Sequence, residues 1–320
     1  MTAASATSGR RSWLTGLIGH GVGPSLTPEL HEREAERQGL RYVYKVIDLP
    51  DGLVDRARLA RLLAAAIELG FDGLNVTHPV KQAMVPLVDE VSPEATAIGA
   101  LNTVLLRGGR TVGHNTDVSG FLRSFRDTLP DADRGRVVLV GAGGAGTAVA
   151  HALCELGTER LLVVDLDEGR AARLAATLRD HPTAVQLVPA TADGLALAMA
   201  GSAGLVNASP MGMAAHPGSP VPGELLRPDL WVADIVYRPL ATALLGSARA
   251  AGCTVLSGAG MAVHQAADAF ELITGRVADR DAMLRDFDEL VAAETTPGST
   301  SSSTTGSTDP ARDTTGERNR

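Results

Sequence analysis

The stretch from Arg136 to Gly146, RVVLVGAGGAG, decides the fold of this chain. An apolar, strand-like run leads into a glycine-rich turn, and an alanine-rich helical pattern follows. In such a unit Gly141 permits a tight turn, Gly143 lets the backbone approach a pyrophosphate, and the last glycine allows close helix–strand packing. The N–H groups that open the helix favour phosphate. The stretch therefore predicts a dinucleotide site, and a glycine-rich turn without a ligand is the alternative. The expected cofactor contacts are Gly141, Ala142, Gly143, Gly144, Ala145 and Gly146.

The next strand of the same unit, LLVVD, ends at Asp165, 24 residues after Gly141. An acidic side chain at this point accepts hydrogen bonds from a ribose 2′-hydroxyl and repels a 2′-phosphate. Asp167 and Glu168 add negative charge, whereas Arg170 could reach an adenosine phosphate. This balance favours NAD over NADP. The alternative is that Asp165 only caps the helix that follows.

Strand-like and helix-like segments alternate along the rest of the chain, which predicts an α/β fold with a mainly parallel, doubly wound sheet. The last helices follow that sheet and are expected to pack back on the first half. We expect strands at 14–18, 42–49, 73–77, 102–106, 110–113, 136–140, 160–165, 185–188, 204–207, 231–236 and 253–256. We expect helices at 27–38, 54–69, 80–88, 117–128, 144–156, 168–179, 191–199, 240–251, 261–274 and 279–293.

The composition restricts the class of protein. The net charge is −8 and aromatic residues make up 3%, so a nucleic-acid surface is not expected. No apolar run approaches the roughly 18 to 20 residues of a membrane helix, and the N-terminus lacks the apolar region of a secretory signal. Cys154 and Cys253 are expected as buried core residues in a reducing cytoplasm. The scattered histidines form no ligand motif, so no metal is expected.

Lysine is rare in this chain, because Lys45 and Lys81 are the only lysines among 29 basic residues. Arginine stays charged, whereas lysine can release a proton when its surroundings favour the amine. Oxidation of an alcohol by hydride transfer requires a group that takes up the hydroxyl proton, and Lys81 and Asp117 are the candidates. A nearby carboxylate favours the ammonium form and burial favours the neutral amine. The alternatives are an exposed helix charge for Lys81 and an N-cap for Asp117.

Polar side chains in the first half stand at expected strand ends or loops. They are Ser25, Thr27, Thr77, Asn102 and Asp117. Hydroxyl, amide and carboxylate groups, together with a lysine, suit a small acid that carries several hydroxyls. Ser25 and Thr27 could equally cap the helix that begins near Pro28.

Seven segments together resemble the shikimate dehydrogenase family, and most of all its NAD-dependent quinate/shikimate dehydrogenase branch. They span most of residues 14–290 in the family's order. The NVTxPxK and NTDxxGF patterns are specific, whereas the glycine loop is not. The segments are GLNVTHPVKQ at 73–82, GALNTV at 99–104, GHNTDVSGF at 113–121, GAGGAG at 141–146, NASPMGM at 207–213, DIVYRP at 234–239 and GMAVHQAADAF at 260–270.

The resemblance implies an N-terminal α/β substrate-binding domain and a Rossmann-like, doubly wound NAD(P)-binding domain. The implied limits are a loose arm at 1–12, a substrate domain at 13–125 completed by 263–293, a cofactor domain at 126–262 and a disordered tail at 294–320. The implied substrate contacts are Ser25 and Thr27 to the carboxylate, and Thr77, Asn102, Asp117 and Gln265 to the ring hydroxyls. Lys81 would be the proton acceptor, paired with Asp117, and the residues near the nicotinamide would be Ala208, Ile235, Tyr237 and Gly258.

Two segments depart from the biosynthetic members of the family. Those members usually carry a Ser-x-Ser pair where this chain has Ser25-Leu-Thr27, and Asn-Arg-Thr where it has Asp165-Leu-Asp167. Both departures resemble the NAD-using quinate/shikimate enzymes. We therefore predict an NAD-dependent, cytoplasmic enzyme, monomeric or homodimeric, that acts at C3 of shikimate or quinate. An NADP-dependent biosynthetic dehydrogenase and a non-catalytic NAD-binding regulator are the alternatives.

Overall fold

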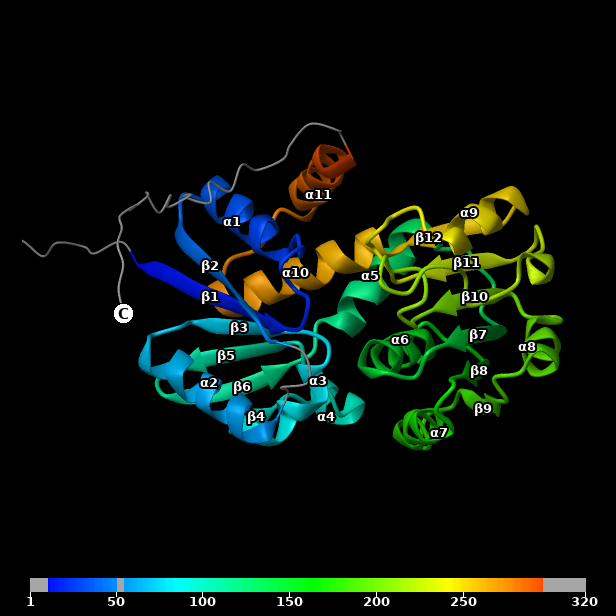
Figure 1. The fold of residues 1–320 in the computed structure, drawn as a ribbon, viewed down its shortest axis with the longest axis horizontal. Helices are drawn as coiled ribbons and strands as arrows, with labels where there is room; N and C mark the ends of the chain where they lie inside the picture. Colours follow the sequence, from blue (N-terminus) through cyan, green and yellow to red (C-terminus); the bar gives the residue numbers. More distant parts are fainter. Residues whose placement is uncertain (1–10, 51–54, 296–320) are drawn as a thin grey trace, which may run out of the picture.

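The computed structural model describes residues 11–50 and 55–295, and Figure 1 shows two α/β lobes side by side. Each lobe is built on a six-stranded sheet. Ser12 belongs to the first strand and not to the loose arm expected over 1–12, and Glu294 still belongs to the last helix. The remaining parts of the expected arm and tail, residues 1–10 and 296–320, lie outside the described residues.

The first sheet is mixed rather than mainly parallel. Its strands are β1 (Ser12–Gly19), β2 (Arg41–Asp48), β3 (Gly73–Val76), β4 (Glu90–Val91), β5 (Thr103–Arg107) and β6 (Arg110–His114), in the order β2-β1-β3-β5-β6-β4. β1 pairs in parallel with β2 and β3, whereas β5 runs antiparallel to both β3 and β6. A turn at Gly108 and Gly109 joins β5 to β6, and both glycines have positive φ angles, which other residues rarely adopt.

The prediction of one helix over residues 80–88 is wrong. The structure has a four-residue helix, α3 (Val80–Ala83), and then a 3-10 turn, η1 (Val85–Leu87). Pro86 in that turn lacks an N–H donor and its ring clashes with a preceding carbonyl, so a continuous helix is blocked.

β4 and the short helix α4 (Pro93–Ile98) were not expected. Ser92 caps α4 by accepting a hydrogen bond from the Ala95 backbone N–H at 3.3 Å. The other helices of this lobe are α1 (Thr27–Arg37) and α2 (Arg56–Glu68).

The second sheet is parallel throughout, as predicted. Its strands are β7 (Arg136–Val140), β8 (Arg160–Val164), β9 (Ala184–Val188), β10 (Gly204–Asn207), β11 (Trp231–Asp234) and β12 (Thr254–Ser257), in the order β12-β11-β10-β7-β8-β9. The order reverses at β7, which has β8 on one side and β10 on the other. Its helices are α6 (Gly144–Glu155), α7 (Glu168–Thr177), α8 (Ala192–Met199), α9 (Ala243–Ala250) and the 3-10 turn η2 (Gly223–Leu225). Cys154 and Cys253 are buried in this lobe, as expected.

Three helices connect the lobes: α5 (Asp117–Thr128), α10 (Gly258–Thr274) and α11 (Arg280–Thr295). In Figure 1, α5 and α10 lie between the two sheets, and α10 runs from the end of β12 toward α1. Gly120 allows the close approach of α5 and α10, because a Cβ there would be 3.0 Å from the Gln265 backbone nitrogen. The α11 helix packs beside α1, where Arg37 pairs with Asp286 at 2.6 Å. The last described helix thereby returns to the first lobe.

Candidate active site

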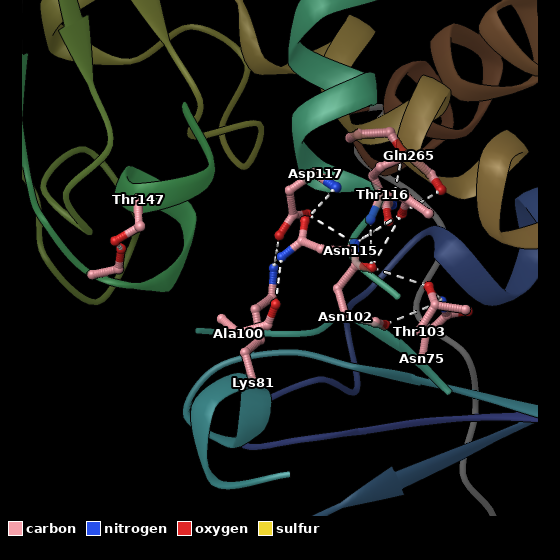
Figure 2. A network of polar contacts seen from close by, with 12 residues as sticks. Asn75, Lys81, Ala100, Asn102, Thr103, Asn115, Thr116, Asp117, Thr147 and Gln265 are labelled. Carbon is pink, nitrogen blue, oxygen red and sulfur yellow. Dashed lines mark hydrogen bonds and ion pairs between the residues drawn. The ribbon is translucent and has the colours of Figure 1, made fainter. Parts of the chain in front are cut away.

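The amine of Lys81 and the carboxylate of Asp117 form an ion pair in the space between the lobes. Lys81 lies on α3, directly after the β3 strand, and its Nζ is 2.6 Å from Asp117 Oδ2 (Figure 2). The side chains are only 16% and 6% exposed. Lys81 is therefore not an exposed surface charge. The alternative in which Asp117 caps α5 is also wrong, because Thr116 occupies that position and the Asp117 side chain turns to Lys81.

Asn102 holds the other oxygen of the same carboxylate. Its Nδ2 donates to Asp117 Oδ1 at 3.0 Å, and its Oδ1 accepts from the Thr116 backbone N–H at 2.9 Å. The Gln265 Oε1 lies 3.5 Å from the same Asn102 Nδ2. Asn115 accepts from the Asp117 backbone N–H at 2.9 Å and thereby fixes the first turn of α5. The structure thus brings together Lys81, Asn102, Asp117 and Gln265, four of the residues predicted from the sequence.

The loop before α1, which carries Pro24 and Ser25, contacts the segment of the second lobe that follows β11. The Ser25 side chain lies near the phenol of Tyr237, a residue that follows β11 of the second lobe. Burial raises the pKa of Tyr237; the nearby Ser25 hydroxyl and the positive charge of Arg238 oppose that rise, and the negative charge of Asp117 adds to it. Arg238 donates to the carbonyl of Pro24 and ties the two lobes together at this point. Tyr237 therefore lies within electrostatic reach of both the Ser25 loop and Asp117.

Ser25 and Thr27 do not cap α1 with their side chains. The N-cap position is Leu26, and Ser25 Oγ accepts from the Thr27 backbone N–H at 3.3 Å. Thr77 stands at the carboxyl end of β3, half-buried, with its methyl group against Gly19. Among the described residues, Thr77 lies outside the hydrogen-bond network around Asp117.

Two glycines of the loop after β7, Gly141 and Gly146, are packed too tightly for other residues. A Cβ at Gly146 would lie 2.0 Å from the Gly141 carbonyl oxygen, and a Cβ at Gly141 would lie 2.7 Å from the Ala208 carbonyl carbon. Ala208 follows β10, so the loops after β7 and β10 meet where the strand order reverses, the place where open α/β sheets bind ligands. A Cβ at Gly144 would be 3.9 Å from Lys81 Cδ. The N-terminus of α6 is thus beside the Lys81 side chain.

The end of β8 combines acidic and basic groups. Asp165 Oδ2 accepts from the Ala142 backbone N–H at 2.7 Å, so its carboxylate fixes the glycine loop. Arg170 Nε lies 3.4 Å from Asp165 Oδ1 and 3.4 Å from Asp167 Oδ2. The cap of α7 is Asp167, which accepts from the Arg170 backbone N–H, so the capping alternative for Asp165 is wrong. Asp165 and Arg170 lie close enough to act on the same part of a ligand.

Asp234 at the end of β11 was not singled out from the sequence. It is 1% exposed and accepts hydrogen bonds from Asn207 Nδ2 at 2.9 Å, Val236 N at 3.1 Å and Thr242 Oγ1 at 2.7 Å. Burial raises the pKa of Asp234, and these hydrogen bonds oppose that rise. Asp234 thereby holds together the segments that carry Ala208, Ile235 and Tyr237. The expected strand over 231–236 hid this position, because the observed strand ends at Asp234.

Gly258 closes this group of contacts. A Cβ at Gly258 would lie 2.5 Å from the Ile235 carbonyl oxygen, so the start of α10 touches the segment after β11.

Within residues 11–50 and 55–295, there is no cluster of three or more side chains that could ligate a metal. In the same described part of the chain, no helix is long and apolar enough to span a membrane.

Comparisons with known proteins show which family the chain belongs to. A family model described as the shikimate dehydrogenase substrate binding domain matches residues 17–104, and one described as the shikimate 5′-dehydrogenase C-terminal domain matches residues 258–285. The chain is 55% identical over 279 residues to shikimate dehydrogenase (NADP(+)) from Streptomyces avermitilis, which covers 87% of this chain and 96% of that protein. It is 49% identical over 277 residues to quinate/shikimate dehydrogenase (NAD(+)) from Corynebacterium glutamicum, covering 86% and 98%.

Among solved structures, quinate dehydrogenase from Corynebacterium glutamicum in complex with NAD superposes with a TM-score of 0.80. The sequences are 48% identical, and the match covers 87% of this chain and 99% of the other. The named relatives divide between NAD and NADP, so they support a nicotinamide cofactor without deciding which one. The chain therefore belongs to the shikimate dehydrogenase family of nicotinamide-dependent oxidoreductases.

Proposed function

We propose that this protein is an NAD-preferring dehydrogenase that oxidises or reduces C3 of shikimate or quinate, with Lys81 as the proton shuttle. The observation that carries the proposal is the 2.6 Å Lys81–Asp117 pair beside the first turn of α6. A proton-transfer group and a dinucleotide loop that face one space provide the two functions a dehydrogenase needs. In this proposal residues 13–125 with 263–293 bind the substrate, and residues 126–262 bind the cofactor.

The substrate would lie against the polar groups of the first lobe. Ser25 and Thr27 would bind the carboxylate, and the phenol of Tyr237 lies next to that pair. Asn102 and Gln265 present amide groups to the ring hydroxyls, and Thr77 would add a hydroxyl. Each of these side chains is half-buried or buried, so its hydrogen bond to a substrate would form away from bulk water, where it is electrostatically stronger.

The proton path is short. During oxidation, Lys81 Nζ would take the proton from the C3 hydroxyl while the substrate's C3–H bond breaks. During reduction, the ammonium of Lys81 would return that proton to the carbonyl oxygen. Asp117 holds Nζ in place, and Asn102 holds Asp117. A bound nicotinamide would accept or supply the hydride.

The cofactor would lie across the carboxyl ends of β7, β8 and β10. Its pyrophosphate would meet the N–H groups of residues 143–146, and its nicotinamide would meet the segments after β10 and β11. The residues expected to line that part are Ala208, Ile235, Tyr237 and Gly258. Asp165 would accept from the adenosine ribose, which supports NAD.

NADP is the second candidate, because Arg170 lies beside Asp165 and the Streptomyces avermitilis relative is named for NADP(+). The test is four parallel assays of initial rate: quinate and shikimate, each with NAD and with NADP. Turnover with NAD on either substrate is the expected result. Turnover confined to NADP would reverse the cofactor assignment. If the cofactor is shown to bind but no assay gives turnover, the proposal of an enzyme would give way to that of a non-catalytic, cofactor-binding regulator.

A further inference from the structure

A chain of buried side-chain hydrogen bonds leads from β2 through the first sheet to Asp117. Tyr44 donates its hydroxyl to Asn75 Oδ1 at 2.7 Å, Asn75 Nδ2 donates to Thr103 Oγ1 at 3.0 Å, and Thr103 Oγ1 donates to Asn102 Oδ1 at 3.1 Å. The last link is Asn102 Nδ2 to Asp117 Oδ1 (Figure 2). Thr103 is 0% exposed. The chain therefore runs without bulk water from a remote strand to the ion pair.

The strand pairing places these groups opposite one another. Asn75 of β3 and Thr103 of β5 are direct partners in the antiparallel register. Asn102 immediately precedes Thr103, so one strand end carries both the amide and the hydroxyl that restrains it. Tyr44 reaches Asn75 across the intervening strand β1, which lies between β2 and β3. The network is therefore a product of sheet topology rather than of a local turn.

The direction of the bonds is set at the two ends of the chain, by a phenol that stays protonated and by a backbone N–H that can only donate. Burial raises the pKa of Tyr44, so its phenol remains a donor. The Thr116 backbone N–H donates to Asn102 Oδ1, which turns Asn102 Nδ2 toward Asp117. The Thr103 hydroxyl accepts from Asn75 and has one hydrogen left, which it gives to the same Asn102 oxygen. Hydrogen bonds aligned in one direction polarise one another.

We propose that Thr103 is a positioning residue: its hydroxyl, fixed by Asn75, holds the Asn102 amide so that Nδ2 faces the Asp117 carboxylate. This inference rests on the proposed function, in which Asp117 in turn holds Lys81. Without the hydroxyl, Asn75 Nδ2 keeps only its longer bond to the Asn102 backbone carbonyl at 3.4 Å, and Asn102 Oδ1 keeps only its Thr116 donors. The amide can then rotate away, and the position of Lys81 relative to C3 of the substrate is no longer fixed.

The first test is kinetic. Thr103→Val removes the hydroxyl at nearly constant volume, and we expect kcat to fall about tenfold, as for one buried hydrogen bond, with the cofactor KM unchanged. Thr103→Ser restores the hydroxyl and should recover most of the loss. The matched control is Thr111→Val: Thr111 is 2% exposed in β6 of the same sheet, and its hydroxyl bonds to Asp89 instead. A uniform fall in all three variants would mean that stability alone was lost.

The second test does not depend on turnover. The chain has two lysines, so ¹³Cε-lysine labelling gives two NMR signals, and Lys45→Arg assigns them. The Lys81 signal should move in Thr103→Val, return in Thr103→Ser and stay in place in Thr111→Val. Tyr44→Phe removes only the hydroxyl donor at the far end of the hydrogen-bond chain, and it should move the Lys81 signal in the same direction by a smaller amount. This variant keeps the test possible if Thr103→Val does not fold.

The two tests separate two kinds of failure. If the wild-type protein turns over and Thr103→Val matches Thr111→Val in both rate and Lys81 signal, the positioning role is overturned while the enzyme stands. If the wild-type protein turns over neither substrate, the proposed function fails. The Lys81 signal in Thr103→Val then still decides whether the hydroxyl positions the pair.

Discussion

Gly144, in the first turn of α6, lies beside the aliphatic chain of Lys81: a Cβ on Gly144 would be 3.9 Å from both Cβ and Cδ of that lysine. The two residues belong to helices of different lobes, Gly144 to α6 and Lys81 to α3. Through this contact the turn proposed to bind phosphate in one lobe meets the lysine proposed to transfer the proton in the other. The reacting ends of a cofactor and a substrate would therefore meet at a place that neither lobe forms alone.

Replacement of Lys81 tests the chemical role directly. Lys81→Met keeps the aliphatic chain and removes the amine, and we expect kcat to fall by a factor of roughly 10² to 10⁴, the usual contribution of a general acid–base group. Cofactor affinity, measured by fluorescence titration, should stay within about twofold, because the glycine loop is untouched. Lys45→Arg, an exposed site in β2, is the control. Near-normal turnover in Lys81→Met would remove this residue from the mechanism.

Two helical glycines give a matched pair for the cofactor loop. At Gly146 an added methyl group would meet the Gly141 carbonyl at 2.0 Å, so Gly146→Ala should displace the loop, cost about 1–3 kcal/mol of unfolding free energy and abolish cofactor binding. At Gly246 in α9 no atom lies within 4 Å. Gly246→Ala should therefore gain up to about 1 kcal/mol. Denaturant unfolding and cofactor titration measure both. Equal behaviour of the two variants would refute the close-packing argument.

We expect the cofactor preference to depend on the charge of Asp165. Asp165→Asn keeps an oxygen that can accept from the Ala142 N–H and removes the negative charge that would repel a 2′-phosphate. We expect kcat/KM with NADP to rise about tenfold, or ~1.4 kcal/mol, while the rate with NAD falls modestly. Arg170→Ala should act in the opposite direction and weaken NADP use. An unchanged ratio of NAD to NADP activity in Asp165→Asn would show that this carboxylate only shapes the loop.

The buried histidine on α1 predicts a pH-dependent stability. Burial lowers the pKa of His31 from 6.5 to about 3, and its Nδ1 lies 2.9 Å from the Tyr42 hydroxyl. Because the folded state resists protonation, unfolding is favoured as the pH falls from 6.5 toward 3, by about 1.4 kcal/mol per pH unit from this group. In His31→Leu that slope should disappear. Urea unfolding of both proteins between pH 7 and 4 measures the difference, and parallel curves would contradict the prediction.

Much of the fold was readable from local patterns. The run RVVLV, the glycine turn and Asp165 predicted a parallel βα unit, and the second sheet is parallel throughout. The helix expected at 80–88 failed because Pro86 interrupts it, a signal that the sequence contains. β4 was missed because two residues are too few to show alternation. Local periodicity predicts helices of several turns and strands of several residues. It carries little information about shorter elements.

The sequence by itself was enough to name Lys81, Asn102, Asp117 and Gln265 as candidate site residues. Their arrangement was decided only by the tertiary structure. Lys81 and Asp117 are 36 residues apart, and Asn102 and Gln265 are 163 apart, so no local pattern fixes which atoms meet. The antiparallel β3–β5 pairing puts Thr103 opposite Asn75, and the packing of α5 on α10 brings Gln265 to Asn102. Sequence spacing determines which face of one strand or helix a side chain occupies, whereas contacts between elements depend on how the whole chain buries its apolar faces.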